Sequence, residues 1–289
     1  MSTAAARPAD PFRPDWWARA AWLALAAYVL YACAQMDVSW ERVAIGLHNA
    51  AHFFGRLLPP NFTRWELLVK GLQESLQIAV LASTLGIFIS LPIGLLAARN
   101  LMPGWVSWPT RLIIALARSF HPVIVAILFV KAVGFGALAG VMALTLASIG
   151  FIGKLFAEAI EEISLKQVEA VRATGAPFMS VIVFSVLPQV FARFIGFCTY
   201  QLDSNLRNST MVGIVGAGGI GGTLFAAFQR FDYDYVCAIL ICIIVLIMVG
   251  EFIATYIRAI FIDGLSYVAL LRRRRGAPMR LRERPLEDD

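Results

Sequence analysis

Charged residues are scarce in this chain: they make up 15% of its 289 residues, whereas apolar residues make up 59%. A soluble domain is about a quarter charged and about half apolar. Apolar runs of about 20 residues, long enough to cross the hydrocarbon core of a bilayer, recur along the sequence. A soluble protein of this length can bury one large core but not several such runs separately. The composition therefore excludes an ordinary soluble protein and predicts an all-α integral membrane protein.

Cysteine and histidine are also rare, with four and three residues. The cysteines all lie in apolar stretches, whereas a secreted disulfide framework would place them in loops with close partners. His48 and His52 have the spacing of two ligands on one helical face, but no carboxylate third ligand accompanies them. We therefore expect no metal site and no catalytic residues, and we interpret the two histidines as a surface pair.

Two nucleotide-binding signatures are excluded. The phosphate-binding loop Gly-x-x-x-x-Gly-Lys-Ser/Thr does not occur, so the chain cannot hydrolyse ATP by that route. Residues 216–221 match the dinucleotide fingerprint GxGxxG, but the strand before it and the acidic residue after it are missing. Two interpretations of these glycines remain open: close packing of a short external helix or re-entrant segment, and simple helix packing.

Much of the excess positive charge lies in the C-terminal tail, in the arginines of residues 272–284, and the N-terminal tail also contains arginines, at Arg7 and Arg13. Basic residues just beyond a span mark a cytoplasmic end. We therefore expect both termini in the cytoplasm and an even number of spans. No aromatic platform or groove-reading motif accompanies the arginines, so we expect no nucleic-acid partner.

The hydropathy pattern predicts six transmembrane helices, and it divides the chain into five consecutive parts. These parts are a cytoplasmic tail (1–15), a first transmembrane helix (16–36), a periplasmic amphipathic segment (37–72), a transmembrane core (73–263) and a basic cytoplasmic tail (264–289). Within the core, spans are expected at about 74–97, 107–132, 134–156, 189–206 and 235–262, with a glycine-rich segment at 209–223. This arrangement puts the loop 157–188 in the cytoplasm.

The loop 157–188 contains the most informative motif. Apolar residues at near-helical spacing predict a helix over 157–174, which Gly175 can end in a left-handed conformation before Pro177 begins the next helix. The segment resembles the EAA loop of permeases of ATP-binding-cassette (ABC) importers, with Val171 and Ser185 departing from the usual pattern. The residues expected by resemblance to couple the chain to an ATPase are Glu169, Ala170, Val171, Arg172, Gly175, Leu187 and Pro188. The alternative is an ordinary amphipathic connection.

A second stretch, residues 202–221, looks like the corresponding segment of phosphonate-type permeases. It contains a run of donor-rich side chains, namely Asp203, Asn205, Arg207, Asn208, Ser209 and Thr210. A tetrahedral oxyanion needs such donors, and arginine can bind it bidentately. The alternative is a structural Asp–Arg pair with capping hydroxyls. Arg118 and His121 are further candidates for side chains that line the pathway. The alternatives are that they extend to the membrane surface by snorkelling or mark a helix break before Pro122.

The resemblance implies a type I ABC importer permease fold, a homodimer, two ATP-binding subunits docked on the loop and a periplasmic solute-binding protein. The chain would be a multi-pass transporter subunit of the bacterial inner membrane, embedded in lipid, and not an enzyme. It would bind no cofactor itself, with ATP and Mg on the partner ATPase. The implied substrate is a phosphonate or a related phosphorus oxyanion. Phosphite, hypophosphite or methionine are alternatives, as is a stand-alone ion-coupled carrier or a membrane-embedded enzyme.

The predicted topology can be tested by labelling from each side of the membrane. In a cysteine-free variant, Thr174→Cys should react with an impermeant maleimide only in inverted vesicles, because the loop 157–188 is predicted to be cytoplasmic. The matched control Thr63→Cys, in the predicted periplasmic segment, should react only from the outside. Labelling of residue 174 from the outside would rule out contact with a cytoplasmic ATPase.

Overall fold

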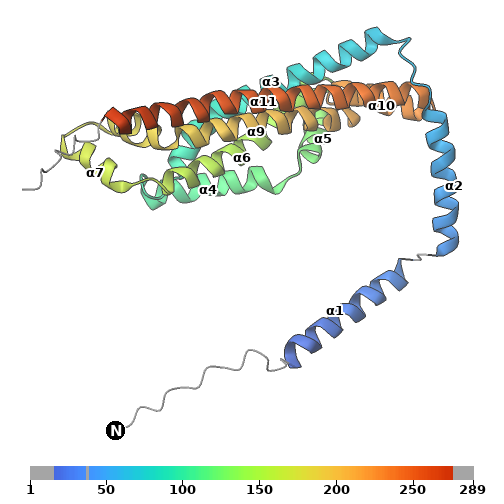
Figure 1. Ribbon diagram of the computed structural model, residues 1–289, viewed down its shortest axis with the longest axis horizontal. Helices are drawn as coiled ribbons and strands as arrows, with labels where there is room; N and C mark the ends of the chain where they lie inside the picture. Colours follow the sequence, from blue (N-terminus) through green and yellow to red (C-terminus); the bar gives the residue numbers. More distant parts are fainter. Residues whose placement is uncertain (1–15, 37–38, 276–289) are drawn as a thin grey trace, which may run out of the picture. The chain divides into compact units, whose positions relative to one another are not determined.

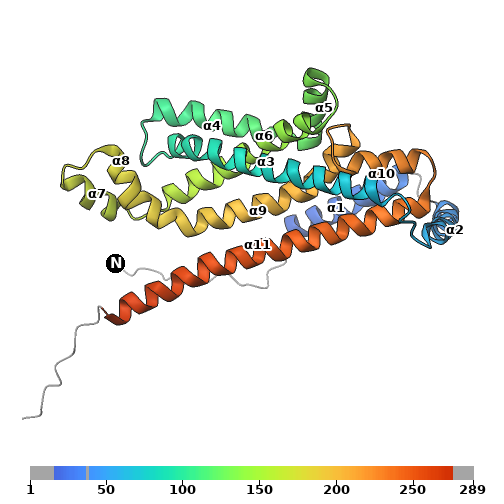
Figure 2. The ribbon, with the colours of Figure 1, turned by 90° about the horizontal axis from the view of Figure 1, so that it is seen from above.

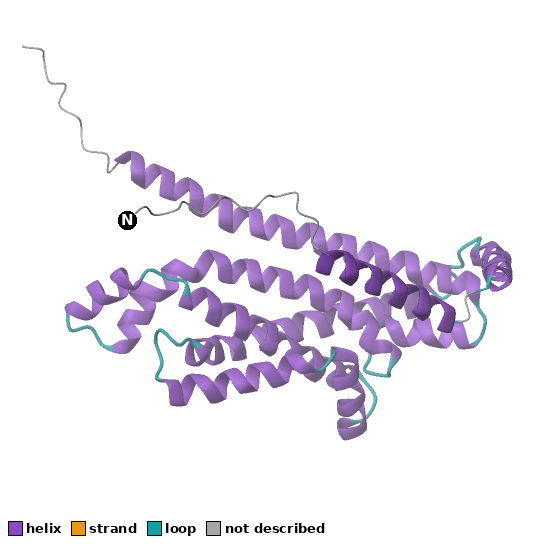
Figure 3. Cartoon of the chain, turned by 90° about the horizontal axis from the view of Figure 1, so that it is seen from below, coloured by secondary structure: helices purple, strands orange, loops and turns teal. Residues whose placement is uncertain are grey.

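The computed structural model describes residues 16–36 and 39–275, and every regular element in that part of the chain is a helix (Figures 1 and 3). The chain divides into two compact units, residues 1–58 and 59–289. Five helices are long and apolar enough to cross a membrane, and a sharply bent helix pair gives a sixth candidate span. The predicted all-α class is confirmed.

The first unit contains α1 (Trp16–Gln35) and α2 (Trp40–Leu57). No residue of α1 is buried, and its apolar side chains are exposed on every side, as expected for a helix surrounded by lipid. By contrast, α2 is amphipathic, and its N-cap Ser39 accepts a hydrogen bond from the backbone N–H of Arg42 at 3.2 Å. Helix α1 thus occupies the stretch predicted as the first span, and α2 occupies part of the predicted amphipathic segment 37–72.

In the second unit, α3 (Trp65–Ala97) packs along α6 (Ala137–Glu161). The buried face of α3 consists almost entirely of small residues, which are Gly71, Ser75, Ala79, Ala82, Ser83, Gly86, Ser90, Gly94 and Ala97. At Gly86 the two backbones are so close that an added Cβ would lie 2.3 Å from the Cβ of Ser148. Small residues allow such contacts because no hydrophobic force draws helices together in lipid and packing must supply the attraction.

Further helical elements complete the second unit. They are α4 (Gly104–Ser119), α5 (Pro122–Val133), α7 (Leu165–Ala173), α8 (Phe178–Val181), the π-helical turn η1 (Ile182–Val186), α9 (Leu187–Ile214), α10 (Ile220–Gln229) and α11 (Tyr233–Arg275). Within this unit, α9 contacts α3, α6 and α11. In Figure 2, α7, α8 and the C-terminal end of α11 lie towards one end of the bundle, and α5 and α10 lie towards the other.

The span expected at 107–132 is not one unbroken helix. The segment forms α4 and α5, which are bent by 91° at a short break. Phe120 and His121 both have extended backbones, with ψ of 136° and 139°. The cause is Pro122, which disfavours the helical conformation in the residue before it and lacks an amide hydrogen.

Several predicted boundaries also shift. The second span begins nine residues earlier than expected, at Trp65, so the boundary at 72/73 falls inside α3. Helix α9 continues past residue 206 to Ile214, because its polar side chains find partners within the bundle. Helix α11 passes through the boundary at 263/264, and residues 276–289 of the predicted tail lie outside the described residues.

The expected helix over 157–174 is divided in two. Helix α6 ends at Glu161 and α7 begins at Leu165. The break is stabilised from α9, where the side-chain Oε1 of Gln189 accepts a hydrogen bond from the backbone N–H of Ser164 at 3.0 Å. Long-range contact with a residue 25 positions away thus overrides the local helical spacing.

The close contact between α3 and α6 predicts a strong effect of one methyl group. Gly86→Ala should lower the free energy of unfolding by about 1–3 kcal/mol, because its Cβ would overlap Ser148 and the helices would have to separate. The matched control is Gly196→Ala in α9, where an added Cβ has no neighbour within 4 Å. Unfolding of both variants by SDS in mixed micelles measures the difference. Equal stability of the two would contradict the packing of α3 on α6.

Candidate functional site

The loop 157–188 folds into a helical knob at one end of the second unit, made of α7, Gly175, α8 and η1 (Figures 1 and 2). Gly175 has φ of +76°, and its N–H donates to the carbonyl of Arg172 at 3.0 Å. This is the left-handed helix end expected from the sequence. Pro177 follows as the N-cap residue of α8, so the chain reverses direction within a few residues.

The knob is fixed to the bundle by a small apolar core. Its members are Phe156, Ala159, Ile160, Val168, Val181, Val186 and Val190, together with Ala98 at the end of α3. Val168, only 2% exposed, is the one buried residue of α7. An ion pair between Arg193 and Glu162 connects α9 to the end of α6. The knob is therefore packed directly on α6 and α9.

The motif residues divide into an exposed face and a base. Glu169, Ala170, Arg172 and Gly175 are exposed, and Val171 is half-buried against the apolar core. Within the described residues, Glu169 makes no ion pair. Leu187 and Pro188 lie at the start of α9, where they form the base of the knob. The exposed face thus offers a carboxylate and a guanidinium on a rigid helix.

The donor-rich run 203–210 does not form one cluster, because it lies in the helix α9 and its side chains point to different sides. Asn205 and Ser209 are fully buried, whereas Arg207 is exposed. Asp203 is nearly buried and pairs with Arg207 one turn away, as the structural alternative expected.

The hydroxyl and amide groups near Arg207 are engaged within their own helix. Thr210 donates to the carbonyl of Arg207 at 2.7 Å, and Ser209 donates to the carbonyl of Leu206 at 2.8 Å. Asn208 donates to the hydroxyl of Ser204 at 3.4 Å. These groups satisfy the helix rather than pointing together at a common ligand position.

Asn205 instead belongs to a buried polar network that joins α3, α6 and α9. Its Nδ2 donates to the hydroxyls of Ser83 and Ser148, both at 2.9 Å. Gln201, one turn earlier, donates to Ser148 at 2.9 Å and to Asn205 Oδ1 at 3.0 Å. Ser148 in turn donates to the carbonyl of Leu144. Sequence reasoning missed Gln201, Ser83 and Ser148; the four-residue spacing of Gln201 and Asn205 was the available signal.

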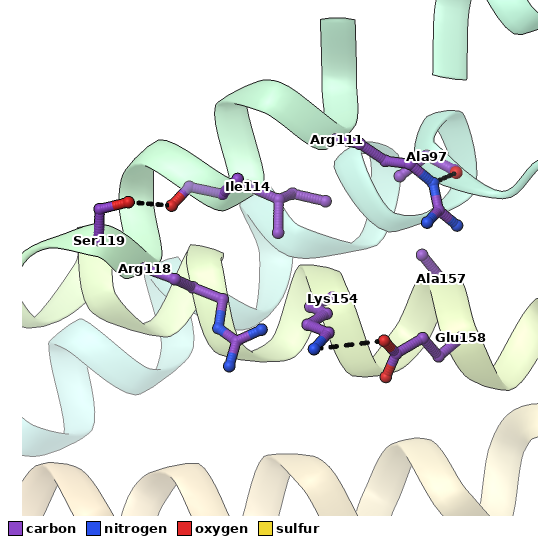
Figure 4. A pocket seen from close by; sticks show the side chains of 9 residues that line it. Ala97, Arg111, Ile114, Arg118, Ser119, Lys154, Ala157 and Glu158 are labelled. Carbon is purple, nitrogen blue, oxygen red and sulfur yellow. Dashed lines mark hydrogen bonds and ion pairs between the residues drawn. The ribbon is translucent and has the colours of Figure 1, made fainter. Parts of the chain in front are cut away.

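His121 and Arg118 have different roles. His121 is the N-cap residue of α5, and its Nδ1 accepts a hydrogen bond from the backbone N–H of Val123 at 3.3 Å. This agrees with the helix-break interpretation. Arg118 lines a cavity of about 430 Å³, shared with Arg111 of α4 and Lys154 of α6 (Figure 4). Nothing in the sequence pattern connects Arg118 with Lys154.

The glycine run between α9 and α10 makes a tight turn rather than a nucleotide site. Gly216, Gly218 and Gly219 all have φ between +82° and +85°, which other residues rarely adopt. No strand precedes the run within the described chain. The apolar helix α10 that follows is short and packs on α3, α9 and α11. Among the side chains described in residues 16–36 and 39–261, no three of His, Cys, Asp or Glu gather into a possible metal site.

Comparison with known proteins places this geometry among transport proteins. Residues 90–263 match the family described as binding-protein-dependent transport system inner membrane component. The chain is 37% identical over 238 residues to the phosphate-import permease protein PhnE of Mycolicibacterium smegmatis, covering 81% of this chain and 44% of that protein. It is 36% identical over 253 residues to the phosphite transport system permease protein PtxC of Stutzerimonas stutzeri, covering 86% of this chain and 92% of that protein.

The fold is also similar to a solved structure, the inward-facing MetNI methionine ABC transporter. The TM-score is 0.62 at 24% sequence identity, and the match covers 70% of this chain and 99% of that chain. This likeness concerns the fold alone. The predicted fold of a type I ABC importer permease is confirmed.

The buried network predicts that Asn205 is needed for stability. Asn205→Ala should lower the free energy of unfolding by about 1–2 kcal/mol, because Ser83 and Gln201 each lose a buried partner. Asn208→Ala, which removes the same side chain from a half-buried position with one long hydrogen bond, should change it by less than about 0.5 kcal/mol. SDS unfolding in mixed micelles compares them. A stable Asn205→Ala protein that had lost only transport would instead support a pathway role.

Proposed function

The chain belongs to the family of binding-protein-dependent transport system inner membrane components, and from this premise we propose that it is the membrane-spanning permease of an ATP-driven importer for a small phosphorus oxyanion or phosphonate. Family membership makes it a multi-pass transport component and not an enzyme. The ATPase is a separate polypeptide, which would bind the ATP and Mg. The relatives named for phosphate and phosphite import support the choice of substrate class. Phosphonate, phosphite and hypophosphite share the tetrahedral phosphorus oxyanion; methionine is the remaining alternative cargo.

The observation that supports this function most directly is the exposed face of the knob. Glu169 and Arg172 lie on the outside of α7, while Val168 anchors the helix from the opposite side. An ATPase that binds this face would push on a rigid body. Because the apolar core of the knob includes residues of α6 and α9, the push would displace two long helices of the bundle.

The same geometry supports the orientation we propose. The knob and the C-terminal end of α11 lie towards one end of the second unit (Figure 2). The arginines at 272–275 mark that end as cytoplasmic by the positive-inside rule. We propose that both termini and the knob face the cytoplasm, where ATP is available.

We further propose that the chain acts as a homodimer with two ATPase subunits docked on its two knobs. A periplasmic solute-binding protein would deliver substrate to the opposite face. Lipid would cover the remaining apolar surface, which includes the exposed side chains of α4 such as Trp105 and Trp108. The dimer places one translocation pathway between or beside two copies of the same bundle.

The coupling function can be tested by uptake measurements on the chain with its ATPase and receptor in proteoliposomes. Glu169→Lys should abolish ATP-dependent uptake of methylphosphonate or phosphite, because it reverses the charge on the exposed face. Gly175→Pro should do the same, since proline cannot adopt φ of +76° and lacks the N–H that bonds Arg172.

The matched control is Gly175→Asn, because asparagine tolerates the left-handed conformation and keeps the N–H. It should retain uptake. Pull-down of the wild-type chain in mild detergent should recover the ATPase, and Glu169→Lys should recover less. Uptake that persisted without any ATPase would favour a stand-alone carrier and refute the proposal.

A further inference from the structure

A cationic cavity lies in the bundle on the side nearest the knob. It has a volume of about 430 Å³ and is bounded by Ala97 at the end of α3, by α4 and by α6. In Figure 4, the side chains of Arg118 from α4 and Lys154 from α6 extend into the same space. Arg111 also lines the cavity. It precedes Arg118 by seven residues, about two turns of α4, and therefore lies on the same helical face.

The pairing of these cations leaves one of them unneutralised. Arg111 pairs with Glu161, and its Nε donates to the carbonyl of Ala97 at 2.9 Å. Lys154 pairs with Glu158 at 3.4 Å, a distance longer than a strong charge-assisted hydrogen bond. Among the ion pairs and hydrogen bonds of the described residues, Arg118 has no partner. The cavity therefore carries an excess of positive charge.

The positive charges of Arg118 and Lys154 lie on helices of the membrane-spanning bundle. Lys154 is seven residues before the end of α6 at Glu161, a rise of about 10 Å along the helix. Ionised side chains at such positions face a cavity or a partner, because lipid does not solvate them. Arg118 is exposed and has no carboxylate partner among the described residues, so an anion that entered the cavity would neutralise its charge.

The backbone is shaped to hold Arg118 in this position. Helix α6 has a glycine, Gly150, under the stem of that side chain. A Cβ added to Gly150 would lie 2.7 Å from Cγ of Arg118 and 3.2 Å from the backbone of Ala117. The missing side chain thus lets α4 approach α6 and directs the guanidinium over α6 towards Lys154.

We propose that this cavity is a binding site for the phosphoryl oxygens of an anion, with Arg118 as the principal ligand and Lys154 as the second. Guanidinium binds such oxygens bidentately, and lysine adds a point charge. The volume exceeds what a phosphate needs and leaves room for an organic substituent. The carboxylate of Glu158 beside Lys154 limits the affinity, which suits a site that must also release its ligand.

The inference rests on the proposed function, because an imported phosphorus oxyanion that moves towards the knob end would meet this cavity before it reaches the cytoplasm. Two sources could supply the phosphoryl oxygens: the free substrate and the headgroup of an anionic lipid. Both share the chemistry that Arg118 recognises. The test therefore has one arm for each source and does not depend on transport.

The first arm measures binding of radiolabelled inorganic phosphate and methylphosphonate to the full-length chain in phosphatidylcholine nanodiscs. Arg118→Gln should weaken binding by about tenfold to a hundredfold, the contribution expected of charge-assisted hydrogen bonds. Gly150→Ala should also weaken it, although every charge is kept, because it displaces the guanidinium. Lys131→Gln, which removes an exposed cation at the end of α5, should have no effect.

The second arm measures the phosphatidylglycerol retained by each variant after purification, using mass spectrometry. Retention that falls in Arg118→Gln but not in Lys131→Gln would assign the site to a lipid headgroup, and loss of phosphate binding would assign it to the free oxyanion. The thermal stability of each variant without anion shows whether lost binding reflects lost folding. The variant Arg118→Lys, which keeps the positive charge, serves the same purpose. If neither phosphate nor lipid binding depends on Arg118, the proposal is overturned.

The outcomes also separate this site from the proposed function. ATP-driven uptake of phosphonate or phosphite with unchanged binding in Arg118→Gln would refute the site and leave the importer intact. Arg118-dependent binding without any uptake would refute the importer and leave the site intact.

Discussion

The bundle depends on one constraint: a polar group inside a bilayer has no water to bond, so the protein must supply its partner. The network around Asn205 meets this constraint with side chains from three helices. The hydroxyl of Ser148 accepts hydrogen bonds from Gln201 and Asn205 and donates one to a backbone carbonyl of α6. Because Gly86 lets α3 approach α6 closely, Ser83 can reach the same amide. Helix packing and polar pairing therefore depend on each other here.

The same constraint explains where charge remains available. Two of the cations that line the cavity have carboxylate partners: Arg111 pairs with Glu161 and Lys154 with Glu158. Arg207 pairs with Asp203 on its own helix. Among the three cations that line the cavity, Arg118 is the one without a carboxylate partner in the described residues. In a medium where an unpaired charge is so unfavourable, the proposed anion would supply the partner that Arg118 lacks.

In the proposed importer, the knob would connect the membrane domain to the ATPase through packing contacts rather than through a chemical reaction. Its exposed face presents Glu169 and Arg172, and its inner side contributes Val168 to a core shared with α6 and α9. The ion pair of Arg193 with Glu162 adds a second connection at the base. Rigid attachment matters because a flexible loop would absorb the displacement that nucleotide binding produces, and the long helices would not move.

The sequence by itself determined the membrane class, the approximate spans and the turn at Gly175, because hydropathy, helix periodicity and the preferences of glycine are local properties. It also indicated the break before Pro122, although only the tertiary structure decided that the break bends the segment by 91°. The tertiary structure alone separated Asn205 from Arg207 and brought Arg118 to Lys154. Those outcomes depend on which helix lies against which face, and that is set by packing between residues far apart in the chain.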